Sequence, residues 1–193
     1  MCGIVGYVGE RPVLDVLISG LKRLEYRGYD SAGYALQGTG DLILRRQKGR
    51  VDELDSQRPE GVDAATCGIA HTRWATHGEP SQRNAHPHTD ASGKIALVHN
   101  GIIENYTQLR RELEAQGIEF YSDTDSEVIA KLVGSEAAKG KKLFVAVRDA
   151  LGRVRGAYGI AVVSADEPDT LVAARYGSPL VVGVGEKEYL VAS

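Results

Sequence analysis

The spacing of hydrophobic residues predicts strands and helices in turn along the chain. Residues 3–9 alternate as a half-buried strand should. Pro12 then suits a first helical turn, and Gly28 would end the helix that follows it. Apolar residues recur there at helical spacing: Leu14, Leu17, Ile18, Leu21 and Leu24. We therefore expect an amphipathic helix that covers a sheet.

Two short strand patterns follow, at residues 31–37 and 42–48, joined by the turn residues Gly38-Thr39-Gly40-Asp41. They predict a hairpin. Residues 49–59 are polar, and we expect them to be irregular. A further strand leads through Ile69 and Ala70 into a polar loop that runs from residue 72 to residue 93. Loops of that length are uncommon in compact domains unless they have a function.

The second half of the chain groups its helices between strands. A short strand at residues 95–98 ends in His99-Asn100-Gly101, and a helix around Leu109 ends at Gly117. The spacing of Thr124-Asp125-Ser126-Glu127 is that of a capping box, which places Asp125 in the first turn of the next helix. One more helix runs through Phe144, and strands are expected at residues 158–164, 171–175, 180–184 and 189–192. This grouping favours a layered α+β fold over a doubly wound parallel sheet.

Composition limits the class of protein. The chain has 193 residues, of which 42% are hydrophobic and 25% charged, so we expect one globular domain with one sizeable core. A net charge of −3 gives no reason to expect nucleic acid or an anionic membrane as a partner. No secretory signal and no long apolar run is present, so a cytoplasmic location is predicted.

The two cysteines, Cys2 and Cys67, cannot form a disulfide framework. Cys67 lies among small and apolar residues, which predicts inert burial in a strand. Cys2 follows the initiator methionine, so removal of Met1 would leave a thiol and a free α-amine on one residue. With pKa values near 8.5 and 8, these groups could act as nucleophile and base. The position of Cys2 in the sequence, taken alone, instead favours the interpretation that it is a small apolar residue at the start of a buried strand.

Three polar clusters are candidates for chemistry. Residues 27–33 end a helix and enter a strand, so turn chemistry could explain their glycines and Asp30. Residues 71–78 lie where a strand gives way to the long loop, and the planar fork of Arg73 suits a carboxylate. A buried structural ion pair is the alternative for Arg73. Asn100-Gly101 could stabilise an oxyanion, although Asn-Gly is also a common turn.

Histidines offer a competing interpretation. His77, His86, His88 and Asp90 lie close in sequence and could bind zinc or another divalent metal. Their spacing does not match a standard zinc signature, and Pro87 indicates a stiff polar loop. We therefore predict no metal site.

Taken together, these motifs resemble a known family. The opening Cys-Gly-Ile is shared by the class II glutamine amidotransferases. The combination of residues 27–33 and 71–78, followed by residues 84–88, is similar to the glutaminase domain of the glutamine–fructose-6-phosphate aminotransferases (isomerizing), or glucosamine-6-phosphate synthases. The similarity runs from Cys2 almost to the last residue. It implies an N-terminal-nucleophile hydrolase fold, a four-layer αββα sandwich.

The resemblance also implies roles for individual residues. Cys2 would attack the side-chain amide of L-glutamine, release ammonia and form a γ-glutamyl thioester, with its α-amine as general base and acid. Asn100 and the backbone N–H of Gly101 would hold the oxyanion. Arg73 would bind the α-carboxylate of glutamine and Asp125 its α-ammonium. The loop that closes over the site would include Trp74, Thr76 and His77, with Thr76 a further candidate for substrate contact. No metal or organic cofactor is implied.

The resemblance further implies partners. In this family a second domain binds fructose 6-phosphate and uses the ammonia for amino-sugar synthesis, toward UDP-GlcNAc, and the full-length enzyme is a homodimer. We expect residues 1–193 to be a single glutaminase domain, cut short at its C-terminal end, that lacks the isomerase domain and hydrolyses glutamine only. Two alternatives stay open: a non-catalytic regulatory module that keeps Met1, and the glutaminase domain of another class II amidotransferase.

Overall fold

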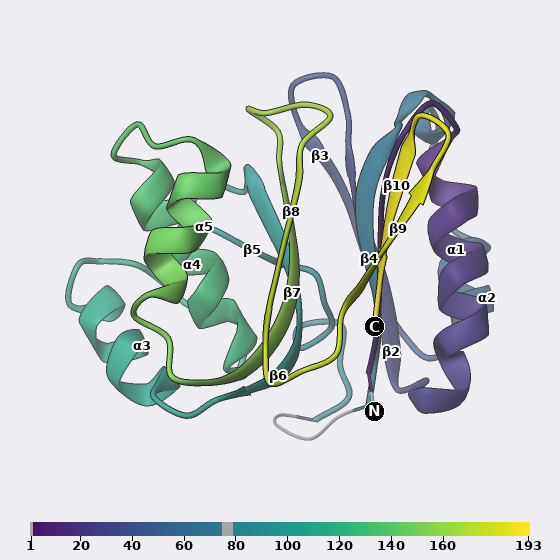
Figure 1. The fold of residues 1–193 in the computed structure, drawn as a ribbon. Helices are drawn as coiled ribbons and strands as arrows, with labels where there is room; N and C mark the ends of the chain where they lie inside the picture. Colours follow the sequence, from purple (N-terminus) through teal and green to yellow (C-terminus); the bar gives the residue numbers. More distant parts are fainter. Residues whose placement is uncertain (1, 75–78) are drawn as a thin grey trace.

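Two antiparallel sheets lie face to face between two layers of helices in the computed structural model, which describes residues 2–74 and 79–193 (Figure 1). The six-stranded sheet has the order β3-β2-β4-β1-β10-β9, and the four-stranded sheet has the order β5-β6-β7-β8. The first comprises β1 (Gly3–Val8), β2 (Ser31–Gln37), β3 (Leu42–Lys48), β4 (Cys67–Arg73), β9 (Val181–Gly185) and β10 (Glu188–Ala192). The second comprises β5 (His88–Thr89), β6 (Ile95–Ile103), β7 (Gly156–Ser164) and β8 (Leu171–Tyr176).

The helices cover the outer faces of both sheets (Figure 1). Helices α1 (Val13–Leu24) and α2 (Val51–Asp55) cover the six-stranded sheet, with short 3-10 turns at Glu25–Arg27 and Val62–Ala64. Helices α3 (Tyr106–Glu114), α4 (Ser126–Ala137) and α5 (Leu143–Leu151) form the other outer layer. The predicted α+β class and the four-layer αββα arrangement are therefore confirmed.

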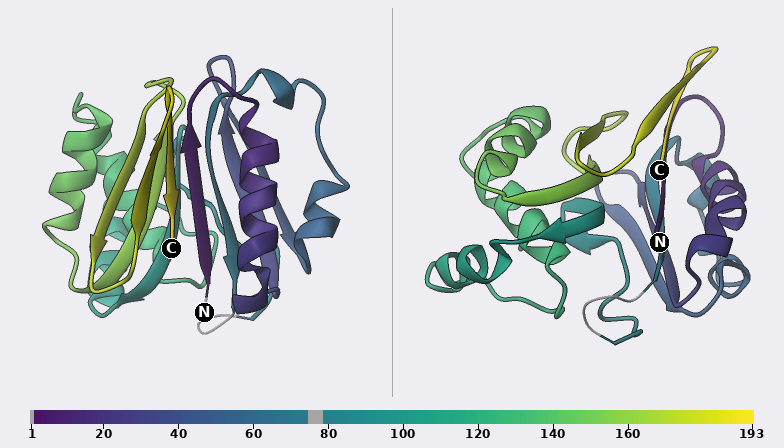
Figure 2. Two further views of the ribbon diagram at one scale, coloured as in Figure 1. Left: turned by 45° about the vertical axis from the view of Figure 1, so that its right-hand side comes forward. Right: turned by 60° about the horizontal axis from the view of Figure 1, so that its bottom comes forward.

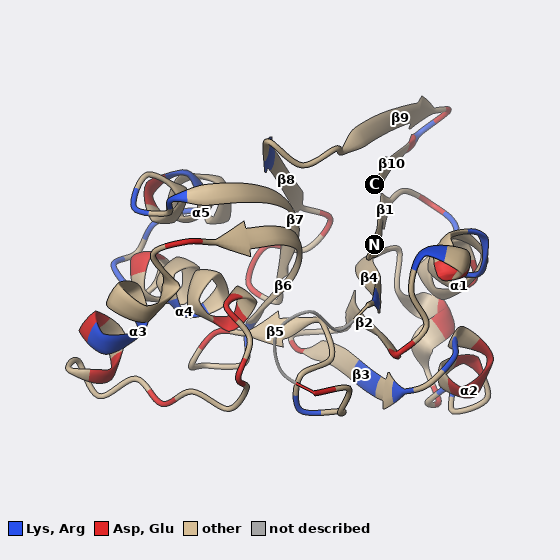
Figure 3. Cartoon of the chain, turned by 90° about the horizontal axis from the view of Figure 1, so that it is seen from below, with Lys and Arg blue, Asp and Glu red and all other residues tan. Residues whose placement is uncertain are grey.

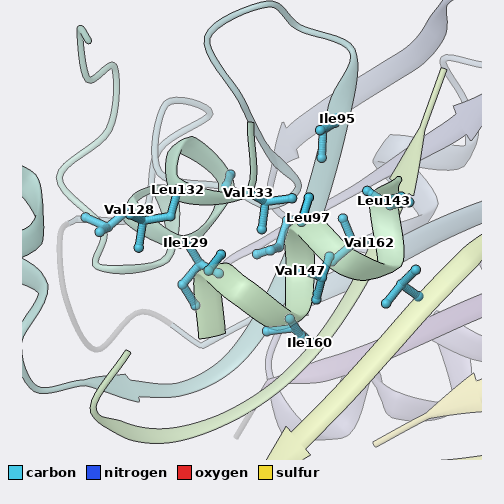
Figure 4. Close-up of a cluster of buried hydrophobic side chains, with 14 of the residues drawn as sticks. Ile95, Leu97, Val128, Ile129, Leu132, Val133, Leu143, Val147, Ile160 and Val162 are labelled. Carbon is cyan, nitrogen blue, oxygen red and sulfur yellow. The ribbon is translucent and has the colours of Figure 1, made fainter. Parts of the chain in front are cut away.

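Alternation along the strands separates the core into layers. In β1, Val5 and Tyr7 pack with α1, whereas Ile4 packs between the two sheets with residues such as Val98 of β6. Between α3, α4, α5 and the four-stranded sheet lies another cluster, which includes Val128, Ile129, Leu132, Val133 and Ile160 (Figure 4). The central strands of each sheet thus bury both of their faces, as a four-layer fold requires, whereas the edge strand β9 is exposed along its length.

Charged residues lie mainly on the outer helices and loops, and the strands carry few of them apart from β3 (Figure 3). Both ends of the chain lie on neighbouring strands, because β1 pairs with β10 in the register Val5↔Ala192 (Figure 2). No described helix has the length and apolar character needed to cross a bilayer.

The structure corrects three local predictions. The strand expected at residues 95–98 does not end at His99-Asn100-Gly101, because β6 continues to Ile103 in its pairing with β7. Residues 51–55 form helix α2 in the segment expected to be irregular, because Val51 and Leu54 are one turn apart and both become buried. The predicted capping box is also wrong. Asp125 stands at the N-cap of α4 without a side-chain capping bond, and the Glu127 carboxylate instead accepts from Tyr121 N at 3.0 Å and Ser122 N at 2.6 Å.

Candidate active site

The antiparallel pairing of β1 with β4 brings Cys2 next to the end of β4. Gly3 lies opposite Thr72 in this register, so Cys2 reaches the two residues that follow. The backbone N–H of Trp74 donates to Cys2 Sγ at 3.3 Å, and the thiol donates to Trp74 O at 3.6 Å. A Cβ at Gly28, the residue after the 3-10 turn Glu25–Arg27, would meet Trp74 N at 2.8 Å, so a glycine is needed where the chain passes this strand end.

Burial raises the pKa of the Cys2 thiol above its ordinary value. The hydrogen bond from Trp74 and the positive charge of Arg73 act in the opposite direction, and the carboxylate of Asp30 adds to the rise. Since the thiolate is the reactive form, a thiol in this position depends on a nearby base to remove its proton.

Asn100 approaches Cys2 from the other sheet, on strand β6. Its Nδ2 donates to the carbonyl oxygen of Cys2 at 3.3 Å and to Ser193 Oγ at 3.1 Å. On the other side of the amide, Oδ1 lies 2.9 Å from His71 Nε2. The amide therefore links the start of β1, the end of β10 and the middle of β4, and its donor end faces Cys2.

Gly101 follows with φ +141°, a conformation that residues with a side chain rarely adopt. A Cβ there would lie 2.0 Å from the carbonyl oxygen of Ala157 on β7. Both the backbone angle and the close approach of β7 therefore require glycine directly after Asn100.

A buried cation and a buried anion lie near the thiol. Arg73, the last residue of β4, is 4% exposed, and burial lowers the pKa of its guanidinium below the ordinary value. Negative charge on three neighbours raises this pKa again: Cys2, Asp30 and Asp125. These groups therefore lie close enough to the Arg73 guanidinium to interact with it electrostatically. The carboxylate of Asp125 is fixed in position by strand β6, since its Oδ2 accepts from the backbone N–H of Ile103 at 2.8 Å. The pair has the charges needed for a zwitterionic amino acid.

A family model described as a glutamine amidotransferase domain matches residues 71–193, which include Arg73, Asn100, Gly101 and Asp125. The chain belongs to the glutamine amidotransferase family. The predicted resemblance is confirmed by this match and by curated relatives that align along the whole chain.

Two such relatives carry the name glutamine–fructose-6-phosphate aminotransferase (isomerizing). The protein of Symbiobacterium thermophilum is 58% identical over 193 residues, which cover 100% of this amidotransferase chain and 31% of that protein. The protein of Streptomyces coelicolor is 54% identical over 194 residues, covering 100% of this chain and 32% of that protein. The chain thus spans about a third of the length of the curated relatives that it matches.

Two solved structures have the same fold as this chain. Glutamine phosphoribosylpyrophosphate amidotransferase from B. subtilis superposes with a TM-score of 0.83 and 27% identity, covering 99% of this chain and 41% of that one. A structure described as the allosteric regulatory enzyme of purine biosynthesis gives a TM-score of 0.85 and 28% identity, covering 100% and 42%. These matches confirm the predicted N-terminal-nucleophile hydrolase fold.

Part of the predicted loop of this amidotransferase chain can be placed. Trp74 is 45% exposed and makes an edge-on contact with Tyr29, with ring centroids 6.0 Å apart. The predictions for Thr76 and His77 lie outside the described residues, as do those that depend on Met1. Cys67 is 1% exposed in β4, so its predicted burial in a strand is confirmed, and its inertness stays a prediction.

Histidines of the amidotransferase chain pack together behind the site. His71 and His86 have ring centroids 4.1 Å apart, and His86 and His88 are 4.6 Å apart. Within residues 2–74 and 79–193, no group of three or more His, Cys, Asp or Glu side chains is arranged to hold a metal ion. The candidate ligand His77 lies outside those residues, and Asp90 instead accepts from Ile95 N at 2.9 Å.

Two residues at the site had no role in the sequence analysis. Ser193 Oγ accepts from Ile4 N at 2.9 Å and from Asn100 Nδ2 at 3.1 Å, so it ties Asn100 to the opening strand. No local pattern could have indicated this contact, because it depends on the pairing of β1 with β10. His71 lies in the recognised motif at residues 71–78, but only the packing of the two sheets brings it to Asn100.

Proposed function

We propose that this chain hydrolyses the side-chain amide of L-glutamine to glutamate and ammonia through a γ-glutamyl thioester on Cys2. The observation that carries the proposal is the donation from Asn100 Nδ2 to the carbonyl oxygen of Cys2 at 3.3 Å. This contact brings a polarising amide to the one cysteine that could carry its own base. Membership of the glutamine amidotransferase family supports the same reaction.

Removal of Met1 would give Cys2 a free α-amine that accepts the thiol proton. Sulfur would then attack the Cδ carbon of glutamine, and the carbonyl oxygen would become an oxyanion held by Asn100 Nδ2 and Gly101 N–H. Loss of one such donor usually costs about 3 kcal/mol in the barrier. The protonated amine would return its proton to the leaving nitrogen, and ammonia would depart. Water, activated by the same amine, would hydrolyse the thioester and release glutamate.

Arg73 and Asp125 would bind the end of glutamine that does not react. The guanidinium fork of Arg73 would donate to the α-carboxylate, and the Asp125 carboxylate would accept from the α-ammonium. Burial supports this assignment, because both charged groups are largely shielded from water, and an opposite charge interacts with them there more strongly than at the surface. Trp74, Thr76 and His77 would belong to the loop that closes over the bound substrate, with Thr76 also contacting it.

A longer protein that contains this chain would use the ammonia for glucosamine 6-phosphate synthesis from fructose 6-phosphate. Names of relatives at 58% and 54% identity support this acceptor over that of the phosphoribosylpyrophosphate enzyme, which is 27% identical. We further propose an isomerase domain in that protein, a homodimeric assembly and a cytoplasmic location. Residues 1–193 would form its glutaminase domain.

A direct test is to measure glutamate release from glutamine while mass spectrometry records whether Met1 is present. Protein without Met1 should hydrolyse glutamine, and Cys2→Ala should abolish the activity while Cys67→Ala keeps it. Retention of Met1 with no hydrolysis would support a non-catalytic module. Equal activity of Cys2→Ala and the unsubstituted protein would overturn the thioester mechanism.

A further inference from the structure

His71 is a fully buried histidine of β4 whose ring reaches the opposite sheet. It is 0% exposed, and its Nε2 lies 2.9 Å from Asn100 Oδ1 and 3.2 Å from the carbonyl oxygen of His99. The carbonyl oxygen of His99 can only accept, whichever way the Asn100 amide is turned, and Asn100 Oδ1 also accepts in the orientation described above. The proton of the neutral ring therefore belongs on Nε2, which donates to both.

The other ring nitrogen agrees with this tautomer. Nδ1 of His71 is buried and has no hydrogen-bond partner among the described residues. An unprotonated nitrogen tolerates this position better than an N–H group, because a buried donor without an acceptor is rare. Burial lowers the pKa of His71 to about 3, so the ring stays neutral near neutral pH. The His86 ring lies against it with an interplanar angle of 31°, which fixes the plane in which Nε2–H points.

Donation from His71 decides which end of the Asn100 amide faces Cys2. An amide that turned by 180° would place its Nδ2 hydrogens against the His71 N–H and its Oδ1 against the carbonyl oxygen of Cys2. Both contacts would then be repulsive, and an acceptor would face the position where negative charge develops during amide attack. The observed orientation instead satisfies His71, Cys2 and Ser193 together.

We propose that His71 is a positioning residue for glutamine hydrolysis, whose Nε2–H holds the Asn100 amide with Nδ2 toward the developing oxyanion. This inference rests on the role proposed above for Asn100. His71 neither touches glutamine nor moves a proton in the reaction; it acts only through the amide of Asn100. Its effect should therefore appear in kcat, while the KM set by Arg73 and Asp125 changes little.

Two isosteric substitutions separate this role from a packing role. The amide nitrogen of glutamine can occupy the place of the histidine Nε2, whereas that of asparagine reaches only the place of Nδ1. His71→Gln should keep kcat for glutamine hydrolysis within about threefold of the unsubstituted protein. His71→Asn should lower kcat by about ten- to a hundredfold, with KM changed less than about twofold, as expected for partial loss of an oxyanion donor. Equal losses in both variants would overturn the proposal.

A double-mutant cycle tests whether His71 acts through Asn100. Asn100→Ala alone should lower kcat by about a hundredfold or more. Adding His71→Asn to it should cause no further loss, because the amide to be oriented is already gone. A full additional loss in the double variant would overturn the proposal for His71. Unchanged kcat in Asn100→Ala would instead contradict the oxyanion role of Asn100, and with it the proposed function.

A measurement on the unsubstituted protein covers the case in which His71→Asn fails to fold. In ¹⁵N NMR spectra between pH 8 and pH 5.5, His71 should remain the neutral tautomer protonated on Nε2, with a slowly exchanging N–H. A ring protonated on Nδ1 over that range could not donate to Asn100, and the inference would then be wrong whatever the variants show.

Discussion

Gly3 lies directly opposite Thr72 where β1 pairs antiparallel with β4. This register places the residue before Gly3 and the residues after Thr72 at the same edge of the sheet. Cys2 consequently accepts the Trp74 N–H at 3.3 Å, next to the buried Arg73. A shift of one residue would turn the side chains of β1 to the opposite face and move Cys2 away from Asn100.

The two thiols should differ sharply in alkylation. Cys2 lies at the start of a strand and is partly exposed, whereas Cys67 is 1% exposed and burial raises the pKa of its thiol to about 12. Iodoacetamide at pH 8 should therefore add one carbamidomethyl group to the folded chain, at Cys2. Intact-mass and peptide mass spectrometry would locate it.

Two controls make the alkylation result specific. Cys2→Ala should leave the folded protein unmodified, and unfolding in urea should expose Cys67 to a second addition. Faster modification of Cys67 than of Cys2 in the folded state would contradict the burial described for β4. Glutamine should slow modification of Cys2 if it binds at this site.

Asp125→Asn should raise the KM for glutamine at least about tenfold and change kcat less. Asn keeps the oxygen that accepts from Ile103 N at 2.8 Å, so the start of α4 should stay in place. The substitution removes the negative charge that would face the α-ammonium group, and it replaces Oδ1, which accepts from Ser126 Oγ at 3.3 Å, by an amide NH2. Steady-state kinetics with glutamine gives both constants.

Asp123→Asn is the matched control for this charge. Asp123 lies two residues away, and its side chain is 53% exposed in an ion pair with Arg83. Exposed pairs of this kind contribute little, so KM for glutamine should stay within about twofold. Equal effects of the two substitutions would show a general loss of negative charge rather than a contact with the substrate.

The layered fold could be predicted from sequence because each layer leaves a local pattern. The hairpin predicted at residues 31–37 and 42–48 has the same bounds as β2 and β3, since alternation and turn residues define both of its ends. Helix α2 was missed because it buries only two apolar residues, Val51 and Leu54. Two positions are too few to show the periodic spacing by which a helix is predicted from sequence. Glu127 was misassigned because the backbone N–H groups of Tyr121 and Ser122 competed for its carboxylate.

Residues of the candidate site could be named from sequence only through motifs. Cys2, Arg73, Asn100 and Asp125 stand in patterns that resemble a family, but their spacing along the chain gives no distance between them. Their convergence depends on the packing of β4 against β6, which brings His71 to Asn100. Ser193 could not have been found, because its contact with Ile4 joins residues at opposite ends of the chain.

Gly101→Ala should lower kcat by about a hundredfold and destabilise the fold by about 2 kcal/mol or more. The residue has φ +141°, and an added Cβ would lie 2.0 Å from Ala157 O. Relief of that contact would move the backbone N–H proposed to bind the oxyanion. Urea denaturation and glutamine kinetics would measure the two effects.

Gly183→Ala serves as the control for Gly101→Ala. Gly183 lies in the exposed strand β9, and an added Cβ would approach only Leu190, at 3.6 Å. We expect kcat within about twofold and a change in unfolding free energy of about 0.5 kcal/mol or less. A comparable loss of kcat in Gly183→Ala would contradict the conclusion that glycine is specifically required at position 101.

His86→Phe should make stability less dependent on pH in the acid range. His86 is buried against His71 and His88, and both of its ring nitrogens lack a hydrogen-bond partner among the described residues. Burial lowers the pKa of His86 well below the ordinary value. Positive charge on nearby groups lowers it further, and these groups are His71, His88, His99 and Arg73. The unfolded chain therefore binds a proton near pH 6.5 that the folded chain does not bind, so acid favours unfolding.

Because acid favours unfolding through His86, the free energy of unfolding should be compared on both sides of about pH 6.5. Above about pH 7.5 both states are neutral at His86, and the free energy of unfolding should not depend on its titration. Below about pH 6.5, stability should fall with each pH unit by about 1 kcal/mol for this histidine. Between pH 7.5 and pH 5, urea denaturation of His86→Phe should accordingly show a loss of stability about 2 kcal/mol smaller than that of the unsubstituted protein. An equal loss in both would mean that His86 takes up its proton in the folded state, and that the ring is not held neutral against His71.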